Sequence, residues 1–272
     1  MGGTWDLNRK SERNDNDGMD EIQGSPEFRS LPEPERQRYR NVSRSLVEMM
    51  QRYAFPLCLA PPLSVGGEVV GATGCLLRLN RGLFIVTANH VLSDYEERVQ
   101  SNRLNWQFGH LPPFDPLPRV AWRDQARDIV FLEISAEEAI RAGNEDSLVF
   151  SAARGWPPPV PTVGQPVLIA GYPRILREVA DASIQSGPYS AVFRTTSAGP
   201  GYFYCQIENE ELISFDGGEL PPPDADVGGL SGGPASLMLP LDYPLVGIVV
   251  EHSRTYNILR IATFEEIPED KI

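Results

Sequence analysis

Three residues of the kinds used in nucleophilic catalysis lie far apart along the chain. His90 follows a strand-like apolar run, Asp128 opens another, and Ser231 lies in the glycine-dense run 229–234. A serine hydroxyl is a weak nucleophile that needs a base within hydrogen-bond reach. Histidine suits this task because its pKa lies near neutrality, and a buried carboxylate can hold its ring in one tautomer. The order His, Asp, Ser is one of those in which such triads occur, so this pattern predicts a serine activated by His90.

The run around Ser231 also fits Gly-x-Ser-x-Gly, the nucleophile turn of the α/β-hydrolases. That arrangement needs an acid and then a histidine after the serine, and only His252 follows it. A helix must also follow the serine, but the residues 232–234 are Gly-Gly-Pro, which disfavours a helix start. The sequence therefore argues against this alternative.

Several stretches of the sequence resemble one known family. They are the strand–turn–strand segment 71–87 leading into Thr-Ala-Asn-His at 87–90, the run 166–173 ending in Gly-Tyr-Pro, and the serine run 229–234. Over roughly residues 60–265 the chain resembles the chymotrypsin/trypsin-like serine proteases, especially short bacterial-type members without disulfides. Asn89 departs from the family pattern, in which a small residue is commoner.

The resemblance implies an all-β fold of two six-stranded antiparallel β-barrels with an N-terminal helix. His90 and Asp128 would come from the first barrel and Ser231 from the second, with the site between them. The backbone N–H groups of Gly229 and Ser231 would form the oxyanion hole, which needs a tight turn with few side chains. Asp124 is the alternative to Asp128, which is preferred because it directly precedes an apolar run.

The primary substrate pocket is predicted by counting from the serine. Its expected residues are Ala225, Asp226, Val250, Glu251 and His252. With Ala225 as its floor, a pocket selective for Arg or Lys is not expected. If Asp226 points inward instead, a basic side chain would gain a charge-assisted contact. Glu251 could select a basic side chain or simply be a solvated charge at a strand end, so the preference stays open.

The chain divides into three predicted parts. Residues 1–33 are polar and form a disordered or vector-derived tail, because 24–28 read like a cloning junction. Residues 34–54 carry apolar side chains at helical spacing and are predicted to be a helix docked on the barrel or binding a regulatory partner. Residues 55–272 form the peptidase domain, with a first barrel at about 55–140 and a second at about 164–265.

Composition narrows the class of protein further. The chain has 272 residues, of which 41% are hydrophobic, and its 24 glycines and 25 prolines favour many short strands. A net charge of −13 would repel nucleic acids. No apolar run is long enough for a transmembrane helix, and no apolar signal core opens the chain, so a cytoplasmic location is expected.

The cysteines and histidines predict no further chemistry. Three cysteines (Cys58, Cys75 and Cys205) are too few and uneven for a disulfide framework, and they are expected to be small buried hydrophobic residues. Besides His90 the chain has only His110 and His252, which lack ligand spacing with any cysteine, so no metal site is predicted. No phosphate-binding or dinucleotide-binding loop is present, and no cofactor is expected.

The sequence therefore predicts a serine endopeptidase that hydrolyses peptide bonds of a protein or peptide substrate through an acyl-enzyme on Ser231. A second hypothesis is a catalytically silent member of the family that binds peptides or partners in the same cleft. A third is an adaptor that acts through its N-terminal helix.

Overall fold

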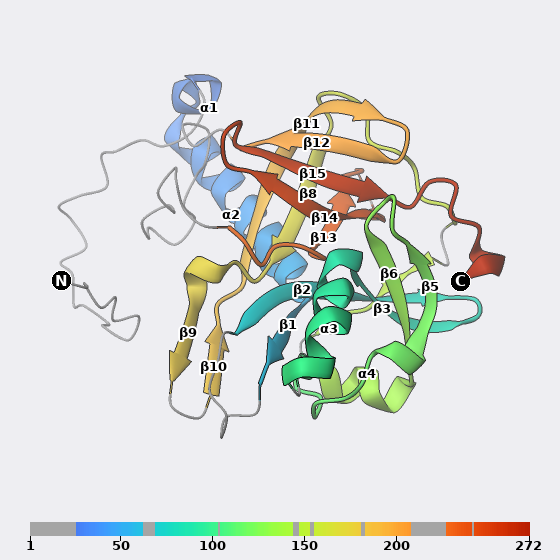
Figure 1. Cartoon of the computed structure of the whole chain (residues 1–272). Coiled ribbons are helices and arrows are strands. Elements are labelled where there is room, and N and C mark those ends of the chain that lie inside the picture. The colour runs from blue at the N-terminus through green and yellow to red at the C-terminus, as the bar shows by residue number, and fades with distance from the viewer. Residues whose placement is uncertain are drawn as a thin grey trace.

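Two groups of mainly antiparallel strands, one from each half of the chain, form most of the molecule (Figure 1). The structure is a computed structural model that describes residues 26–61, 69–102, 104–143, 147–152, 155–180, 183–207, 227–240 and 242–272. The strands of the first half are β1 (Ala54–Ala60), β2 (Val70–Leu79), β3 (Gly82–Ala88), β4 (Asn105–Phe108), β5 (Val120–Asp124), β6 (Ile129–Ile134) and β7 (Phe150–Ser151). Those of the second half are β8 (Pro166–Gly171), β9 (Arg177–Ala180), β10 (Ser183–Ser186), β11 (Tyr189–Gly199), β12 (Tyr202–Gln206), β13 (Pro234–Leu237), β14 (Leu245–Ser253) and β15 (Ile258–Thr263).

The first half is a curled sheet with the strand order β4-β1-β2-β3-β6-β5, and β7 pairs with β2 beside this path. It differs from the predicted closed barrel because the described strands β4 and β5 do not pair with each other. The edge of β4 is already occupied, since Phe114 N donates a hydrogen bond of 3.0 Å to Trp106 O. The connection after β4 thus takes the place that closure would need.

The second half is a closed six-stranded barrel in the order β11-β12-β15-β14-β13-β8, as predicted, and β9 and β10 form a separate hairpin. Its strand β8 is buried on both faces. Val167 and Ile169 pack inside the barrel, whereas Leu168 and Ala170 join the larger core that extends into the first half. Because side chains alternate between the faces of a strand, one apolar run serves both cores.

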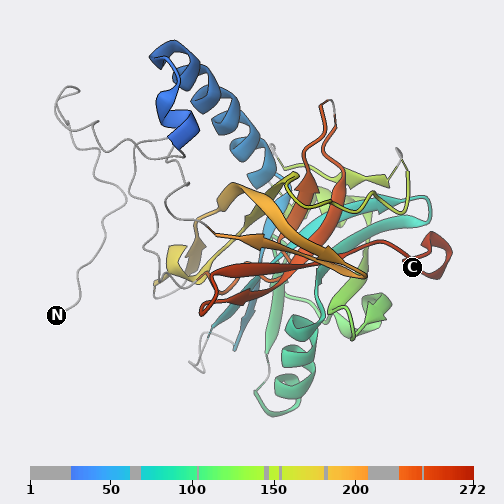
Figure 2. The same cartoon turned by 90° about the horizontal axis from the view of Figure 1, so that it is seen from above.

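Four α-helices lie outside the two strand groups within the described ranges: α1 (Pro26–Ser30), α2 (Glu33–Gln51), α3 (Asn89–Asn102) and α4 (Ala136–Ala142). The predicted helical segment 34–54 thus holds most of α2 and the first residue of β1. The C-terminal part of α2 packs on β8 and β11, and Ser190 Oγ donates to Val47 O over 3.1 Å. The other end of α2 projects away from the barrel (Figure 2). Among the described helices, none has the length and apolar character needed to cross a membrane.

Candidate active site

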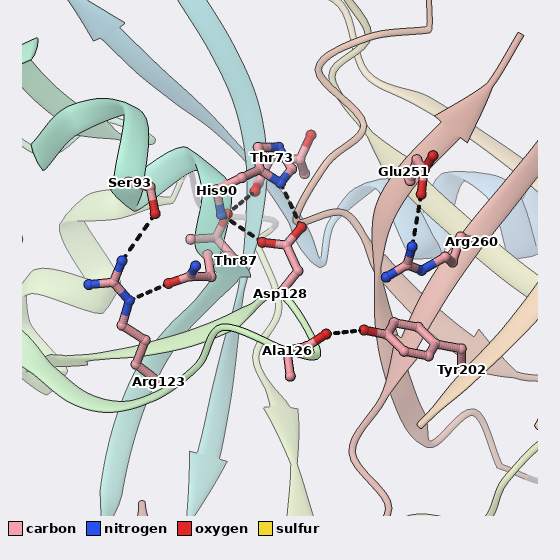
Figure 3. Close-up of polar contacts among 11 residues, drawn as sticks. Thr73, Thr87, His90, Ser93, Arg123, Ala126, Asp128, Tyr202, Glu251 and Arg260 are labelled. Atoms are coloured by element: carbon pink, nitrogen blue, oxygen red, sulfur yellow. Dashed lines mark hydrogen bonds and ion pairs between the residues drawn. The ribbon is translucent and has the colours of Figure 1, made fainter. Parts of the chain in front are cut away.

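Two hydrogen bonds join His90 to Asp128 (Figure 3). His90 lies in the first turn of α3, directly after β3, and Asp128 ends the four-residue turn between β5 and β6. The backbone N of His90 donates to Asp128 Oδ1 over 2.7 Å, and Nδ1 of the ring lies 2.6 Å from Oδ2. Because the carboxylate engages Nδ1, the free base nitrogen of a neutral imidazole is Nε2.

The backbone of Asp128 holds this geometry in a sparsely populated conformation. Its φ is 61°, in the left-handed region that aspartate tolerates better than most residues. Its carbonyl oxygen accepts a hydrogen bond of 3.0 Å from Asn89 N. This bond joins the main chain of Asp128 to the residue just before His90. The Asn89 side chain accepts a bond from Arg123 Nε, which explains how this position accommodates a polar residue that is buried.

The surroundings of His90 raise the pKa of its imidazole above the usual value near 6.5. Burial acts to lower the pKa, because it disfavours the charged ring. The hydrogen bond to Asp128, the charge of that carboxylate and the charge of Asp94 outweigh this effect. The site therefore stabilises the imidazolium that a general base becomes after it takes a proton.

The alternative carboxylate, Asp124, has different partners. Its Oδ1 accepts a hydrogen bond of 2.9 Å from Arg127 N, and its Oδ2 lies 3.7 Å from Arg127 Nε. The side chain of Asp124 thus stabilises the turn between β5 and β6. The structure places Asp128 against the imidazole, whereas Asp124 bonds Arg127 in the turn that carries Asp128.

The turn that carries Ser231 is pinned to both halves of the molecule. Ser231 O accepts a hydrogen bond of 2.9 Å from Thr73 N in β2, and Gly232 N donates over 2.7 Å to Val249 O in β14. Among the described residues there is no hydrogen bond between Ser231 Oγ and His90 Nε2. Such catalytic hydrogen bonds are often long or poorly aligned without substrate. The serine turn is therefore fixed between β2 of the first half and β14 of the second, without a direct hydrogen bond from Ser231 Oγ to His90.

Gly232 is required by this close docking. Its φ is 84°, and a Cβ atom added there would overlap the carbonyl oxygen of Thr73 and the hydroxyl of Thr87. Only a residue without a side chain lets the two segments approach so closely. Both the close packing and the positive φ therefore favour glycine at the position after the serine.

The predicted oxyanion donors lie in peptides whose carbonyl groups are anchored. Gly228 O accepts a bond of 2.5 Å from Arg174 N, and Leu230 O accepts one of 2.7 Å from Gly233 N. In a trans peptide the N–H points away from the carbonyl, so the N–H groups of Gly229 and Ser231 are directed away from these anchors. Neither donates a hydrogen bond to another residue in the described part of the chain.

Thr73 is a residue of this site that the sequence analysis did not identify. Its hydroxyl donates to Gly229 O over 2.7 Å and accepts from Tyr172 N over 2.9 Å, and the side chain is fully buried. Its sequence signal is weak, because a threonine between small residues at the start of a strand is also an ordinary strand residue. Its role depends on segments that are far away in the sequence.

The predicted pocket residues fall into two groups. Ala225 and Asp226 lie outside the described residues. Val250 is buried in the core between the halves, Glu251 forms an ion pair of 3.0 Å with Arg260 Nη1, and His252 Nε2 lies 3.4 Å from Asn257 Oδ1. The structure turns Glu251 toward a cation of its own barrel.

The remaining candidates for chemistry have ordinary settings. Cys75 and Cys205 are buried and Cys58 is half-buried, and none of them forms a disulfide. Burial raises the pKa of the Cys205 thiol to about 12, against the opposing effect of a hydrogen bond with Thr195. His110 is exposed. Within the described ranges, no cluster of His, Cys, Asp and Glu could hold a metal ion.

The sequence and structure were compared with known proteins and protein families. The model of the trypsin-like peptidase domain matches residues 72–235, which include all three predicted catalytic residues. A search of curated proteins finds no match. Among solved structures, the active form of the Rv3671c protease from M. tuberculosis is similar, with a TM-score of 0.46 and 16% identity over 82% of this chain and 83% of that one. Because the family model covers more than half of the sequence, the chain belongs to the trypsin-like peptidase domain family.

Proposed function

We propose that this trypsin-like peptidase is a serine endopeptidase that cleaves protein substrates through an acyl-enzyme on Ser231. The observation that carries the proposal is the pair His90–Asp128, joined by two hydrogen bonds of 2.7 and 2.6 Å at the strand ends on which the serine turn is docked. A structural histidine would not need a carboxylate that engages both its backbone and its ring. This arrangement suits a base whose orientation matters.

The reaction would begin with attack of Ser231 Oγ on the substrate carbonyl carbon. His90 Nε2 takes the hydroxyl proton, and Asp128 stabilises the resulting imidazolium. The N–H groups of Gly229 and Ser231 bind the oxyanion of the tetrahedral intermediate. When the peptide C–N bond breaks, His90 gives its proton to the leaving amine, and the acyl group stays on Ser231. Water then attacks the ester by the same steps, and the acid product and the free serine are released.

A proteolysis assay with an unfolded protein substrate tests this proposal. We expect Ser231→Ala to lower turnover on the order of 10⁶-fold, the scale found for nucleophile loss in another serine protease. Ser45→Ala is the matched control, because Ser45 lies on the exposed face of α2 and donates only to Asn41 O. Cleavage that survives Ser231→Ala would refute the proposal. A folded wild type that cleaves nothing would also contradict it and favour a silent peptide-binding module.

A further inference from the structure

The turn between β5 and β6, residues 125–128, touches the second half of the molecule through two side chains. The hydroxyl of Tyr202, at the start of β12, donates a hydrogen bond to Ala126 O (Figure 3). Arg127 reaches the segment after β15, where Nη1 donates to Glu265 O over 2.5 Å and Nη2 to Glu266 Oε2 over 3.0 Å. We call Tyr202, Arg127, Glu265 and Glu266 the turn clamp. It joins the second barrel to the turn that ends in Asp128.

Arg127 is held from several sides. Its side chain is only 20% exposed, and it lies against Asp124 at the end of β5 as well as Glu266 on the opposite half. The carboxylate of Glu265 is itself fixed, because Oε1 accepts a bond of 2.7 Å from Gly201 N. A planar guanidinium that reaches two acceptors of one segment imposes a direction as well as an attraction. The clamp thus restricts the rotation of the turn against the second half.

Asp128 is the next residue along the chain, and its geometry is demanding. It has a φ of 61° and places one carboxylate oxygen on the backbone and one on the ring of His90. A non-glycine residue in this region is strained and persists only when its surroundings hold it there. The bond from Asn89 fixes the carbonyl side of Asp128, and the clamp fixes the residues on its amino side.

We propose that Arg127 and Tyr202 are positioning residues, which let the second barrel hold the Asp128 carboxylate on His90. This inference rests on the proposed function in one respect, that Asp128 orients His90 as the base. It implies that docking of the two halves does more than bring Ser231 to the site. The same docking aligns the acid–base pair that lies entirely within the first half.

The test compares Arg127→Met and Tyr202→Phe with the control Arg81→Met. Arg81 also bonds the C-terminal segment, through Nη1 to Asp270 O over 2.8 Å, but it lies on the turn between β2 and β3. Tyr202→Phe removes the hydroxyl and keeps the ring on which Arg260 stacks at 4.1 Å. We expect kcat to fall about ten- to a hundredfold in the two clamp variants, with KM within about twofold, because a small misplacement of catalytic groups is costly. Arg127→Lys should recover part of the loss.

A second readout does not need catalysis. NMR titration of the His90 imidazole reports whether Asp128 still engages the ring. In the described part of the chain, the charged groups that act on this ring are Asp128 and, from α3, Asp94. We expect the clamp variants to lower the pKa of His90 toward its ordinary value and to weaken the deshielding of the Nδ1 proton, whereas Arg81→Met changes neither.

The two readouts separate the possible failures. If the clamp variants only lower the unfolding temperature and leave kcat and the His90 titration unchanged, the inference is wrong and the clamp is merely structural. If wild type shows no turnover that depends on Ser231, the proposed function fails, and the titration alone still decides whether the clamp positions Asp128. If Arg127→Met does not fold, Tyr202→Phe provides the same comparison.

Discussion

The two halves of the molecule prepare their catalytic groups in different ways. In the first half, His90 and Asp128 lie at neighbouring strand ends of one sheet and are joined by side-chain hydrogen bonds. In the second half, Ser231 lies on a turn that is fixed by backbone contacts, one to Thr73 across the interface and one to β14. The residues of the acid–base pair thus belong to one unit and meet the second barrel only through the turn clamp, whereas the nucleophile is placed directly by the docking of two units.

This contrast predicts which catalytic group a substitution in each part of the molecule would affect. The open sheet of the first half builds the His90–Asp128 pair at the adjacent ends of β3 and β6, so this pair does not depend on closure of the sheet into a barrel. The closed barrel of the second half offers a rigid frame for the serine turn and for the turn clamp. Residues at the interface should therefore affect both the nucleophile and the base, and residues inside either unit only one of them.

The largest effect is expected for the carboxylate that faces His90. Asp128→Asn should lower kcat on the order of 10⁴-fold, because an amide stabilises the wrong tautomer of the imidazole. Asp124→Asn keeps an oxygen that can accept from Arg127 N, so Asp128 should shift only slightly. We expect its kcat to fall no more than about tenfold, because small displacements of catalytic groups have modest but measurable costs. Turnover of both variants in one assay makes the comparison. If Asp124→Asn proved the more damaging, the assignment of Asp128 would be wrong.

A smaller effect is expected from adding a side chain at Gly232, where the serine turn contacts the first half. Gly232→Ala should destabilise the protein by about 3 kcal/mol or more, because the added methyl group would overlap Thr73 and Thr87 in the interface. Gly164→Ala is the control, since Gly164 has a similar φ of 87° with no atom near its Cβ position, and should cost only about 1–2 kcal/mol. Urea unfolding at one pH measures both. Equal losses would show that backbone strain, not close docking, explains Gly232.

The smallest effect is expected at the outer wall of the second barrel. Glu251 is 57% exposed and pairs with Arg260, so Glu251→Gln should change stability by less than about 1 kcal/mol. Because this carboxylate already faces a cation, we expect the ratio of kcat/KM for substrates with lysine and leucine before the cleaved bond to change less than threefold. A large drop for the lysine substrate would instead assign Glu251 to the primary pocket.

Much of this arrangement could be predicted from local sequence. The strand that leads to His90, the apolar run after Asp128 and the glycine turn around Ser231 each have a pattern that spans only a few residues. The β-rich fold and the closed second barrel followed from the same family pattern. The open first sheet did not, because the bond between Phe114 and Trp106 that covers β4 has no sequence signal.

The contacts that connect the halves were beyond local patterns. Thr73 and Gly229 are 156 residues apart, and Arg127 and Glu266 are 139 apart. Thr73, Arg127 and Glu266 each have an ordinary local context: a threonine in a strand, an arginine in a turn and a glutamate near the end of the chain. Their roles arise only when the two halves dock, so a single sequence indicates the chemical groups but not what supports them.

The most direct test of a serine activated across the interface is the rate at which a fluorophosphonate labels Ser231 as a function of pH, with the adduct mapped by mass spectrometry. We expect labelling of Ser231 that His90→Ala abolishes. The rate should rise with pH through an apparent pKa above about 6.5, because only neutral His90 can accept the proton and its pKa is raised. No labelling of wild type, or labelling of Ser231 that is unchanged in His90→Ala, would contradict the account.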